Sequence, residues 1–184
     1  MSIRVFLNKG LSKLVIVAII LIVIVLSAIA IYYFSQNATT KQDVFTVQNA
    51  TSLQVSADVV GSNVLGNQGA INPFKWSVAN VGTSNQKIRL TIYASESDQT
   101  GFTYILNAQN QAAWKKENGT WISTNYNELN NLWGTEWTQT LNQLKAKWTG
   151  NGNVSFSNSF GDNVTVTNVV INPELSDSAF EPAN

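Results

Sequence analysis

LVIVAIILIVIVLSAIAIYYF, residues 14–34, is an apolar stretch that only Ser27 interrupts and that ends in two tyrosines and a phenylalanine. A helix rises about 1.5 Å per residue, so this stretch would span about 30 Å, the thickness of the hydrocarbon core of a bilayer. Inside lipid, a helix satisfies every backbone N–H and C=O group internally. Tyr32 and Tyr33 stand where an aromatic belt would meet the membrane interface. The stretch therefore predicts a helix that anchors the chain in membrane lipid.

Charge predicts the orientation of this anchor. Arg4, Lys9 and Lys13 lie before the stretch, and no acidic residue occurs before Asp43. Positive residues stay on the cytoplasmic side, so we expect a single-pass protein with its N-terminus inside and its C-terminal domain outside. A cleaved secretory signal is the alternative. The apolar core of such signals is shorter, about 7–15 residues, although the small residues of 27–30 resemble a cleavage site.

The basic N-terminus ends in Lys9-Gly10, directly before Leu11. This arrangement resembles the leader of archaeal type IV pilins and archaellins, which a prepilin-type peptidase cuts after a Lys/Arg-Gly or Lys/Arg-Ala pair. The resemblance implies cleavage between Gly10 and Leu11, after which the freed helices would pack into a filament core. Lys13 does not fit this resemblance well, because it would place a charge in the filament core. The alternative is an uncleaved cytoplasmic flank, since basic residues accompany any anchor of this orientation.

Composition restricts the chemistry of the 150 residues that follow the stretch. The chain has no cysteine and no histidine, which removes disulfides, thiolate ligands, the usual general base and the commonest metal ligand. Eight Lys/Arg and eleven Asp/Glu residues give this part a net charge of −3, and no basic patch indicates a nucleic-acid partner. Charged residues make up only 12% of the chain, and its polar load falls on Asn, Gln, Ser and Thr. We therefore expect an exterior that tolerates an acidic or otherwise harsh medium.

Beyond a polar tether, apolar and polar residues alternate with period two, which predicts half-buried strands. Asn118-Gly119 lies between two of these segments and suits the positive-φ positions of a type I′ hairpin turn. The segment NVGTSNQ, 80–86, resembles the hairpin connection of many Ig-like domains on archaeal surface and pilus proteins. Residues 61–73, rich in Gly and Asn, are expected to be a connection. The predicted strands are 53–59, 74–78, 88–92, 102–106, the two arms of the hairpin within 114–121, 154–156 and 164–171.

From Glu128 the apolar period becomes helical, with Gly134 weakening the start and a Gly/Asn cluster at 150–153 ending the helix. We therefore predict a mainly β fold, an Ig-like β-sandwich with one inserted helix, preceded by a single N-terminal transmembrane or filament-core helix. The stripe of this inserted helix consists of Leu129, Leu132, Trp133, Glu136, Trp137, Leu141, Leu144 and Trp148. The predicted organisation is 1–10 leader or cytoplasmic flank, 11–34 transmembrane or core helix, 35–45 tether and 46–184 extracellular sandwich.

Two carboxylate patterns are candidate chemical sites. Glu96-x-Asp98-x-Thr100-Gly101 places oxygen ligands at alternate positions, as a calcium loop does, but it lacks the closing bidentate acid, so a solvated turn is favoured. Glu128 and Glu136 lie eight residues apart on the predicted helix, and surface charges are favoured over a glycosidase pair. We expect no catalytic residue, no cofactor and no metal.

Tryptophans and glycosylation sequons complete the candidate features. Trp133, Trp137 and Trp148 are expected in the core between helix and sheet, whereas Trp114 and Trp121 are the pair expected to be exposed, for glycan or subunit contacts. Asn-x-Ser/Thr sequons mark acceptors for N-linked glycans. They occur at Asn37, Asn49, Asn118, Asn153 and Asn163.

Two functions from different classes follow from these expectations. The first is a type IV pilin-like filament subunit that self-assembles through residues 11–34 and displays its domain for adhesion. The second is a non-polymerising, membrane-anchored accessory subunit that contacts other membrane or surface-layer proteins, for example in an archaellum motor or a respiratory complex. Lys13 and the aromatic end of the apolar stretch favour the second function.

Overall fold

The computed structural model describes residues 46–61, 69–95, 97–98 and 101–183. These residues belong to one compact unit, 45–184. The apolar stretch 14–34 and the tether that follows it lie outside the described residues. Within the described part, no helix has both the length and the apolar character needed to cross a bilayer.

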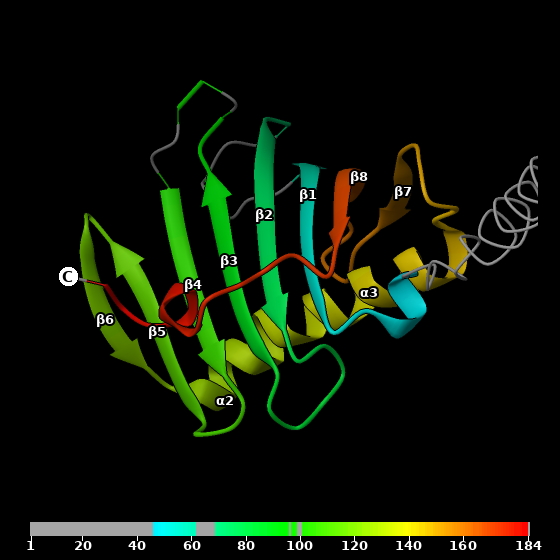
Figure 1. The fold of residues 1–184 in the computed structure, drawn as a ribbon. Coiled ribbons are helices and arrows are strands. Elements are labelled where there is room, and N and C mark those ends of the chain that lie inside the picture. The colour runs from blue at the N-terminus through cyan, green and yellow to red at the C-terminus, as the bar shows by residue number, and fades with distance from the viewer. Residues whose placement is uncertain (1–45, 62–68, 96, 99–100, 184) are drawn as a thin grey trace, which may run out of the picture. The chain divides into compact units, whose positions relative to one another are not determined.

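Eight strands form a single antiparallel sheet in the order β6-β5-β4-β3-β2-β1-β8-β7 (Figure 1). The first six strands are a meander in which each strand pairs with the next one along the chain. The last hairpin returns to the opposite side, where β8 pairs with β1. The strands are β1 Ser52–Val60, β2 Ile71–Ala79, β3 Lys87–Tyr93, β4 Gly101–Asn107, β5 Ala112–Glu117, β6 Thr120–Thr124, β7 Val154–Ser157 and β8 Asn163–Ile171.

A helical segment connects β6 at one edge of the sheet to β7 at the other. It consists of α2 (Tyr126–Leu129), a π-helical turn η2 (Asn130–Gly134) and α3 (Thr135–Lys147). The Asn125 side chain caps its start by accepting hydrogen bonds from the backbone N–H groups of the second and third helical residues. At about 1.5 Å per residue the segment is about 33 Å long, which matches the width of eight strands spaced about 4.8 Å apart. The segment is therefore long enough to connect the two edges of the sheet in a single crossing of one face.

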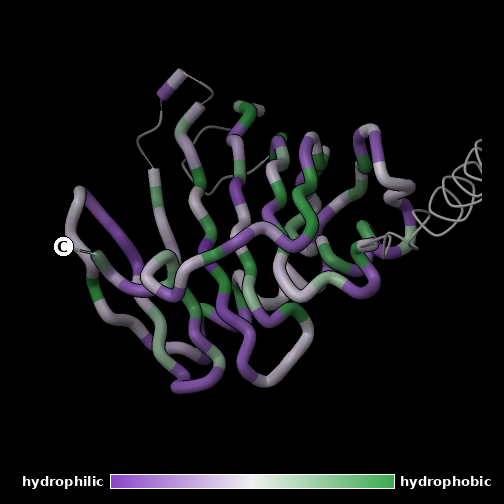
Figure 2. The backbone as a smooth tube through the Cα atoms, viewed as in Figure 1, coloured by the Kyte–Doolittle hydropathy of each residue, from purple (hydrophilic) through white to green (hydrophobic). Residues whose placement is uncertain are grey.

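The helix crosses one face of the sheet (Figures 1 and 2). The main core lies between these two layers. Alternate residues of the central strands are buried there, as period-two patterning requires. Tryptophans join the two layers: the rings of Trp76 and Trp137 lie 5.6 Å apart, and Trp133 lies 5.2 Å from Tyr104 and 6.1 Å from Phe74. The prediction that Trp133 and Trp137 are core residues is confirmed.

The prediction of a mainly β fold with one inserted helix is confirmed for the described residues, but the two-sheet Ig-like arrangement is not. Alternating strands establish that one sheet face is buried, and a second sheet or a helix can cover such a face equally well. Here the second layer is the helix. The segment 80–86 does form a hairpin connection between β2 and β3, which is common to both architectures.

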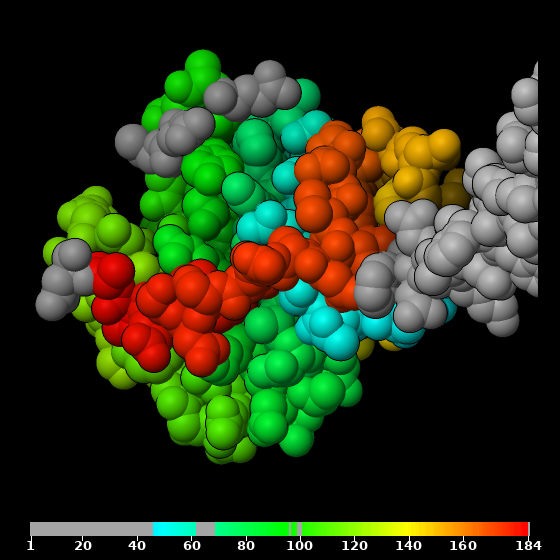
Figure 3. All heavy atoms as spheres, viewed as in Figure 1, coloured from blue at the N-terminus to red at the C-terminus, as the bar shows by residue number. Residues whose placement is uncertain are grey.

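The C-terminal segment 173–183 crosses the other face of the sheet (Figure 3). Its short helix η3 (Asp177–Phe180) packs against β3 and β4. Phe180 is only 1% exposed, and Ile105 of β4 is fully buried although neither belongs to the main core cluster. Polar contacts fix the segment further: Arg89 donates to the carbonyl of Ala179, and Lys87 forms an ion pair of 2.7 Å with Asp177. We call residues 173–183 the C-terminal strap.

The prediction that residues 61–73 are a connection is wrong at its end, because residues 71–73 belong to β2, which begins at Ile71 and includes Pro73. A proline lacks the N–H that a central strand donates. At this end, however, β2 extends beyond its pairing with β3, which starts at Phe74. The Asn72 side chain fills the gap by donating hydrogen bonds to the carbonyls of Tyr93 and Ala94.

Candidate functional site

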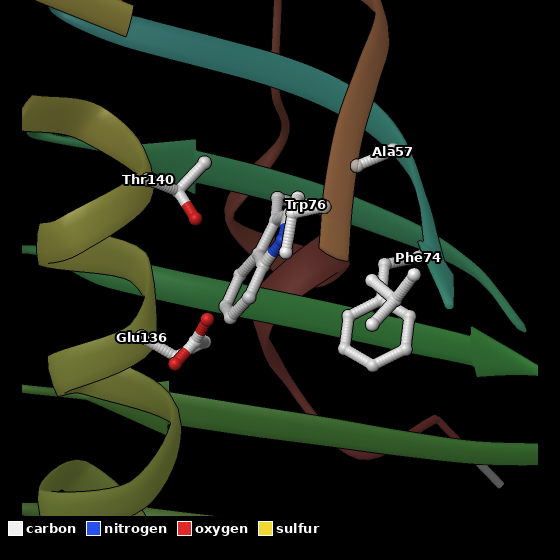
Figure 4. Close-up of a pocket in the computed structure, with 7 residues that line it drawn as sticks. Ala57, Phe74, Trp76, Glu136 and Thr140 are labelled. Carbon is white, nitrogen blue, oxygen red and sulfur yellow. The ribbon is translucent and has the colours of Figure 1, made fainter. Parts of the chain in front are cut away.

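The feature with the most unusual electrostatics is a carboxylate buried between helix and sheet. Glu136 belongs to α3, and it is only 3% exposed. Together with Thr140, one turn later, it points toward Trp76 in a small pocket (Figure 4). The pocket has a volume of about 10 Å³, close to the minimum that holds one water molecule. Its other lining residues are all apolar: Ala57, Val59, Phe74 and Val164.

The loop between β7 and β8 supplies the polar partners of Glu136. The Ser159 hydroxyl donates a 2.8 Å hydrogen bond to Glu136 Oε2. Asn158 holds this loop in shape, because its Oδ1 accepts from the backbone N–H groups of Phe160 and Asp162. Its side-chain amide in turn donates to the Asp162 carboxylate. The loop is thus built so that one hydroxyl faces the helix.

Burial raises the pKa of Glu136 above its ordinary value. Hydrogen bonds from Ser159 and Asn158 work against this shift, and the negative charge of the nearby Asp162 adds to it. In the described part of the chain, no lysine or arginine forms an ion pair with Glu136. A buried carboxylate without a cation is shifted toward its protonated form, because burial disfavours the charge.

This geometry corrects the prediction that Glu128 and Glu136 are both surface charges. Glu128 is exposed in α2, whereas Glu136 is buried. In the sequence, Glu136 lies on the apolar stripe of the helix. This position was the signal from which its burial could have been predicted. The partner Ser159 lies 23 residues away, and no sequence spacing connects the two residues.

The candidate calcium loop cannot be assembled from the described residues, because Glu96 and Thr100 lie outside them. The adjoining residues form a polar turn in which Ser95 N–H donates to the Asp98 carbonyl, and Asp98 N–H donates to the Ser95 hydroxyl. Among the residues that the structure places, no group of three or more metal-ligating His, Cys, Asp or Glu side chains occurs.

The tryptophans predicted to be exposed are intermediate in burial. Trp114 lies in β5, and Trp121 lies in β6. The indole N–H of Trp121 donates to the carbonyl of Ala183 in the C-terminal strap, and the Lys116 ammonium lies 5.6 Å from its ring centroid. The strap thus accepts a hydrogen bond from the edge of this ring. Trp148 is also intermediate in burial, and it packs against the core rather than within it.

Four of the five sequon asparagines lie in the described part, and all four are exposed. Asn118 and Gly119 have φ values of 49° and 80° and form the predicted type I′ turn between β5 and β6. Asn49 differs from the others because its Oδ1 accepts a 2.8 Å hydrogen bond from the backbone N–H of Thr46. Asn153 precedes β7, and Asn163 begins β8.

The remaining predicted sites, Gly10, Leu11 and Asn37, lie outside the described residues. No family model matches the chain, and comparisons with curated proteins and with solved structures found no match.

Proposed function

We propose that this chain is a non-catalytic extracellular surface protein, a type IV pilin-like filament subunit that displays its β-sheet domain for adhesion. One observation carries the proposal: Lys9-Gly10 directly precedes Leu11 and the apolar stretch 14–34, and a folded β-rich domain follows. In this proposal residues 11–34 form a helix that first spans the membrane and later packs into the filament core.

The distribution of sequons supports an outward-facing domain. Asn49, Asn118, Asn153 and Asn163 are exposed, and the first residue of each sequon is therefore open to a glycosylating enzyme. Asn118 is the best presented of them, because it occupies the tip of a two-residue hairpin. N-linked glycans on these side chains are part of the proposal.

Lys13 favours a second candidate function. After cleavage at Gly10 this lysine would be the third residue of a helix packed among other apolar helices, where an unpaired charge is costly. In an uncleaved chain it stays at the cytoplasmic interface at little cost. The chain would then be a membrane-anchored accessory subunit of a surface or respiratory complex and would not polymerise.

Intact mass with N-terminal peptide mapping separates the two functions. The protein is taken from native cells as two samples, the sheared surface filaments and the washed membrane fraction. A mature chain that begins at Leu11 and is recovered with the filaments supports the pilin-like subunit. A chain that retains Met1 or Ser2 and stays with the membrane refutes it and favours the accessory subunit.

A further inference from the structure

The two edges of the sheet differ in how their backbones are covered. At β7, two side chains of α3 reach the strand: Gln139 donates a 3.0 Å hydrogen bond to the carbonyl of Ser157, and Lys147 donates one of 3.4 Å to the carbonyl of Ser155. These are alternate residues, whose carbonyls point to the same side of a strand. The helix therefore occupies backbone acceptors that a further strand would need at this edge.

The opposite edge, β6, has no such cover. The Trp121 indole N–H donates to the strap, but no described side chain forms a hydrogen bond with the free backbone edge of β6. The strand reads Thr-Trp-Ile-Ser-Thr and contains no charged residue, glycine or proline. Charges and prolines are the usual devices that keep edge strands from pairing with other chains. Ile122, at the centre of β6, is 41% exposed.

We infer that β6 is a docking strand for a second copy of this chain, paired antiparallel about Ile122. A two-fold interface must be complementary to itself. Antiparallel pairing centred on Ile122 sets this residue against its own copy and Thr120 against Thr124 of the partner. Because β6 is uncharged, no like charges meet within the pairing, and Thr–Thr and apolar cross-strand pairs are favourable. The two sheets then continue into one another across the axis.

This inference does not depend on cleavage at Gly10, and it holds for a filament subunit and for an anchored one. A five-residue strand offers a small contact area, well below that of a standard protein–protein interface, so the pairing is weak between molecules free in solution. A covalent trap on the full chain in lipid vesicles is therefore the appropriate measurement.

The chain has no cysteine, so single cysteines report individual contacts. Directly opposed residues of an antiparallel pair have Cα atoms about 4.5–5.5 Å apart, within the range that a disulfide bridges. Ile122→Cys is expected to give a disulfide-linked dimer under mild oxidation. Phe160→Cys, at a position that is 51% exposed in the loop after β7, measures the yield from random collisions. Ser155→Cys tests the covered edge.

Register gives a sharper test. Differently tagged Thr120→Cys and Thr124→Cys chains, mixed in the same vesicles, are expected to form the mixed dimer several times more readily than either forms a homodimer. Adding Ile122→Lys to both chains places two ammonium groups together at the axis, and it should reduce the mixed dimer to the collisional yield. Unchanged thermal unfolding of the lysine variant confirms that its fold is intact.

Two results would overturn the inference. One is an Ile122→Cys dimer yield no higher than that of Phe160→Cys. The other is a Thr120→Cys homodimer that forms as readily as the mixed dimer, since this indicates parallel or non-specific contact. Neither result bears on N-terminal processing, so the docking strand and the pilin-like function can fail separately. Protein from a host that does not glycosylate it leaves Asn118, which adjoins β6, unmodified in these experiments.

Discussion

The Asn130 side chain occupies the space that a Cβ atom on Gly134 would need. The two residues are the first and last of the π-helical turn, and the backbone N–H of Thr135 bonds to the carbonyl of Asn130. Such turns insert an extra residue into a helix. Gly134, which the sequence marks as a weak point, is thus the residue that lets this turn close over a polar side chain.

Gly134→Ala is expected to destabilise the domain, although alanine in a helix is ordinarily more stable than glycine by about 1 kcal/mol. We expect the clash with the Asn130 side chain to outweigh this gain, so that the substitution lowers the free energy of unfolding. In an Asn130→Ala background the same substitution should recover the ordinary gain. Urea unfolding of the four chains of this double-mutant cycle gives the coupling energy. A coupling energy near zero would show that the Asn130 side chain moves aside freely.

Glu136→Gln is expected to make the domain more stable at neutral pH. The pKa of Glu136 is raised in the folded state because burial disfavours its charge. A carboxyl group with a raised folded pKa gives its full contribution below the unfolded pKa, about 4.3, and loses it as pH rises through the folded value. The advantage of the glutamine variant should therefore shrink as pH falls through that window.

The measurement is the free energy of unfolding at several pH values between 3 and 7 for both proteins. Glu128→Gln is the matched control, because Glu128 lies on the same helical segment and is exposed. Its substitution removes a carboxylate from the same helical segment without changing the buried site. If the Glu136→Gln variant showed the same dependence of unfolding free energy on pH as the parent, the claim that burial raises the pKa of Glu136 would be wrong.

The sequence predicted the strands and the helical stripe because both depend on short-range periodicity. It did not predict the single sheet, because the alternation of Leu53, Val55 and Ala57 shows that one face is buried without showing what covers it. The Glu136–Ser159 contact and the strap were also missed. Both join segments far apart in the chain through one or two side chains, and no local pattern records such contacts.

Phe180→Ala is expected to release the C-terminal strap and to lower the free energy of unfolding by about 3–5 kcal/mol, the usual cost of truncating a buried phenylalanine. Phe180 is 1% exposed, and the hydrogen bonds and the ion pair with the exposed Asp177 that hold the strap cannot replace its buried ring. Phe160→Ala, at a half-exposed position, should change stability by less than about 1 kcal/mol. Equal effects in the two variants would mean that the strap contributes no more than a surface residue.

Gly101→Ala is expected to be among the most damaging small substitutions in the domain. An added Cβ would run into the backbone carbonyl of Ile92 on the neighbouring strand, and a backbone atom cannot move aside as a side chain can. We expect the β3–β4 pairing to be displaced at this end, at a cost of more than about 2 kcal/mol in the free energy of unfolding. Gly82→Ala separates this clash from the general cost of replacing glycine: it has open space around it and a φ of 73°, so only backbone strain of about 1 kcal/mol applies. If Gly101→Ala unfolds no more easily than Gly82→Ala, β4 does not begin as close to β3 as the register requires.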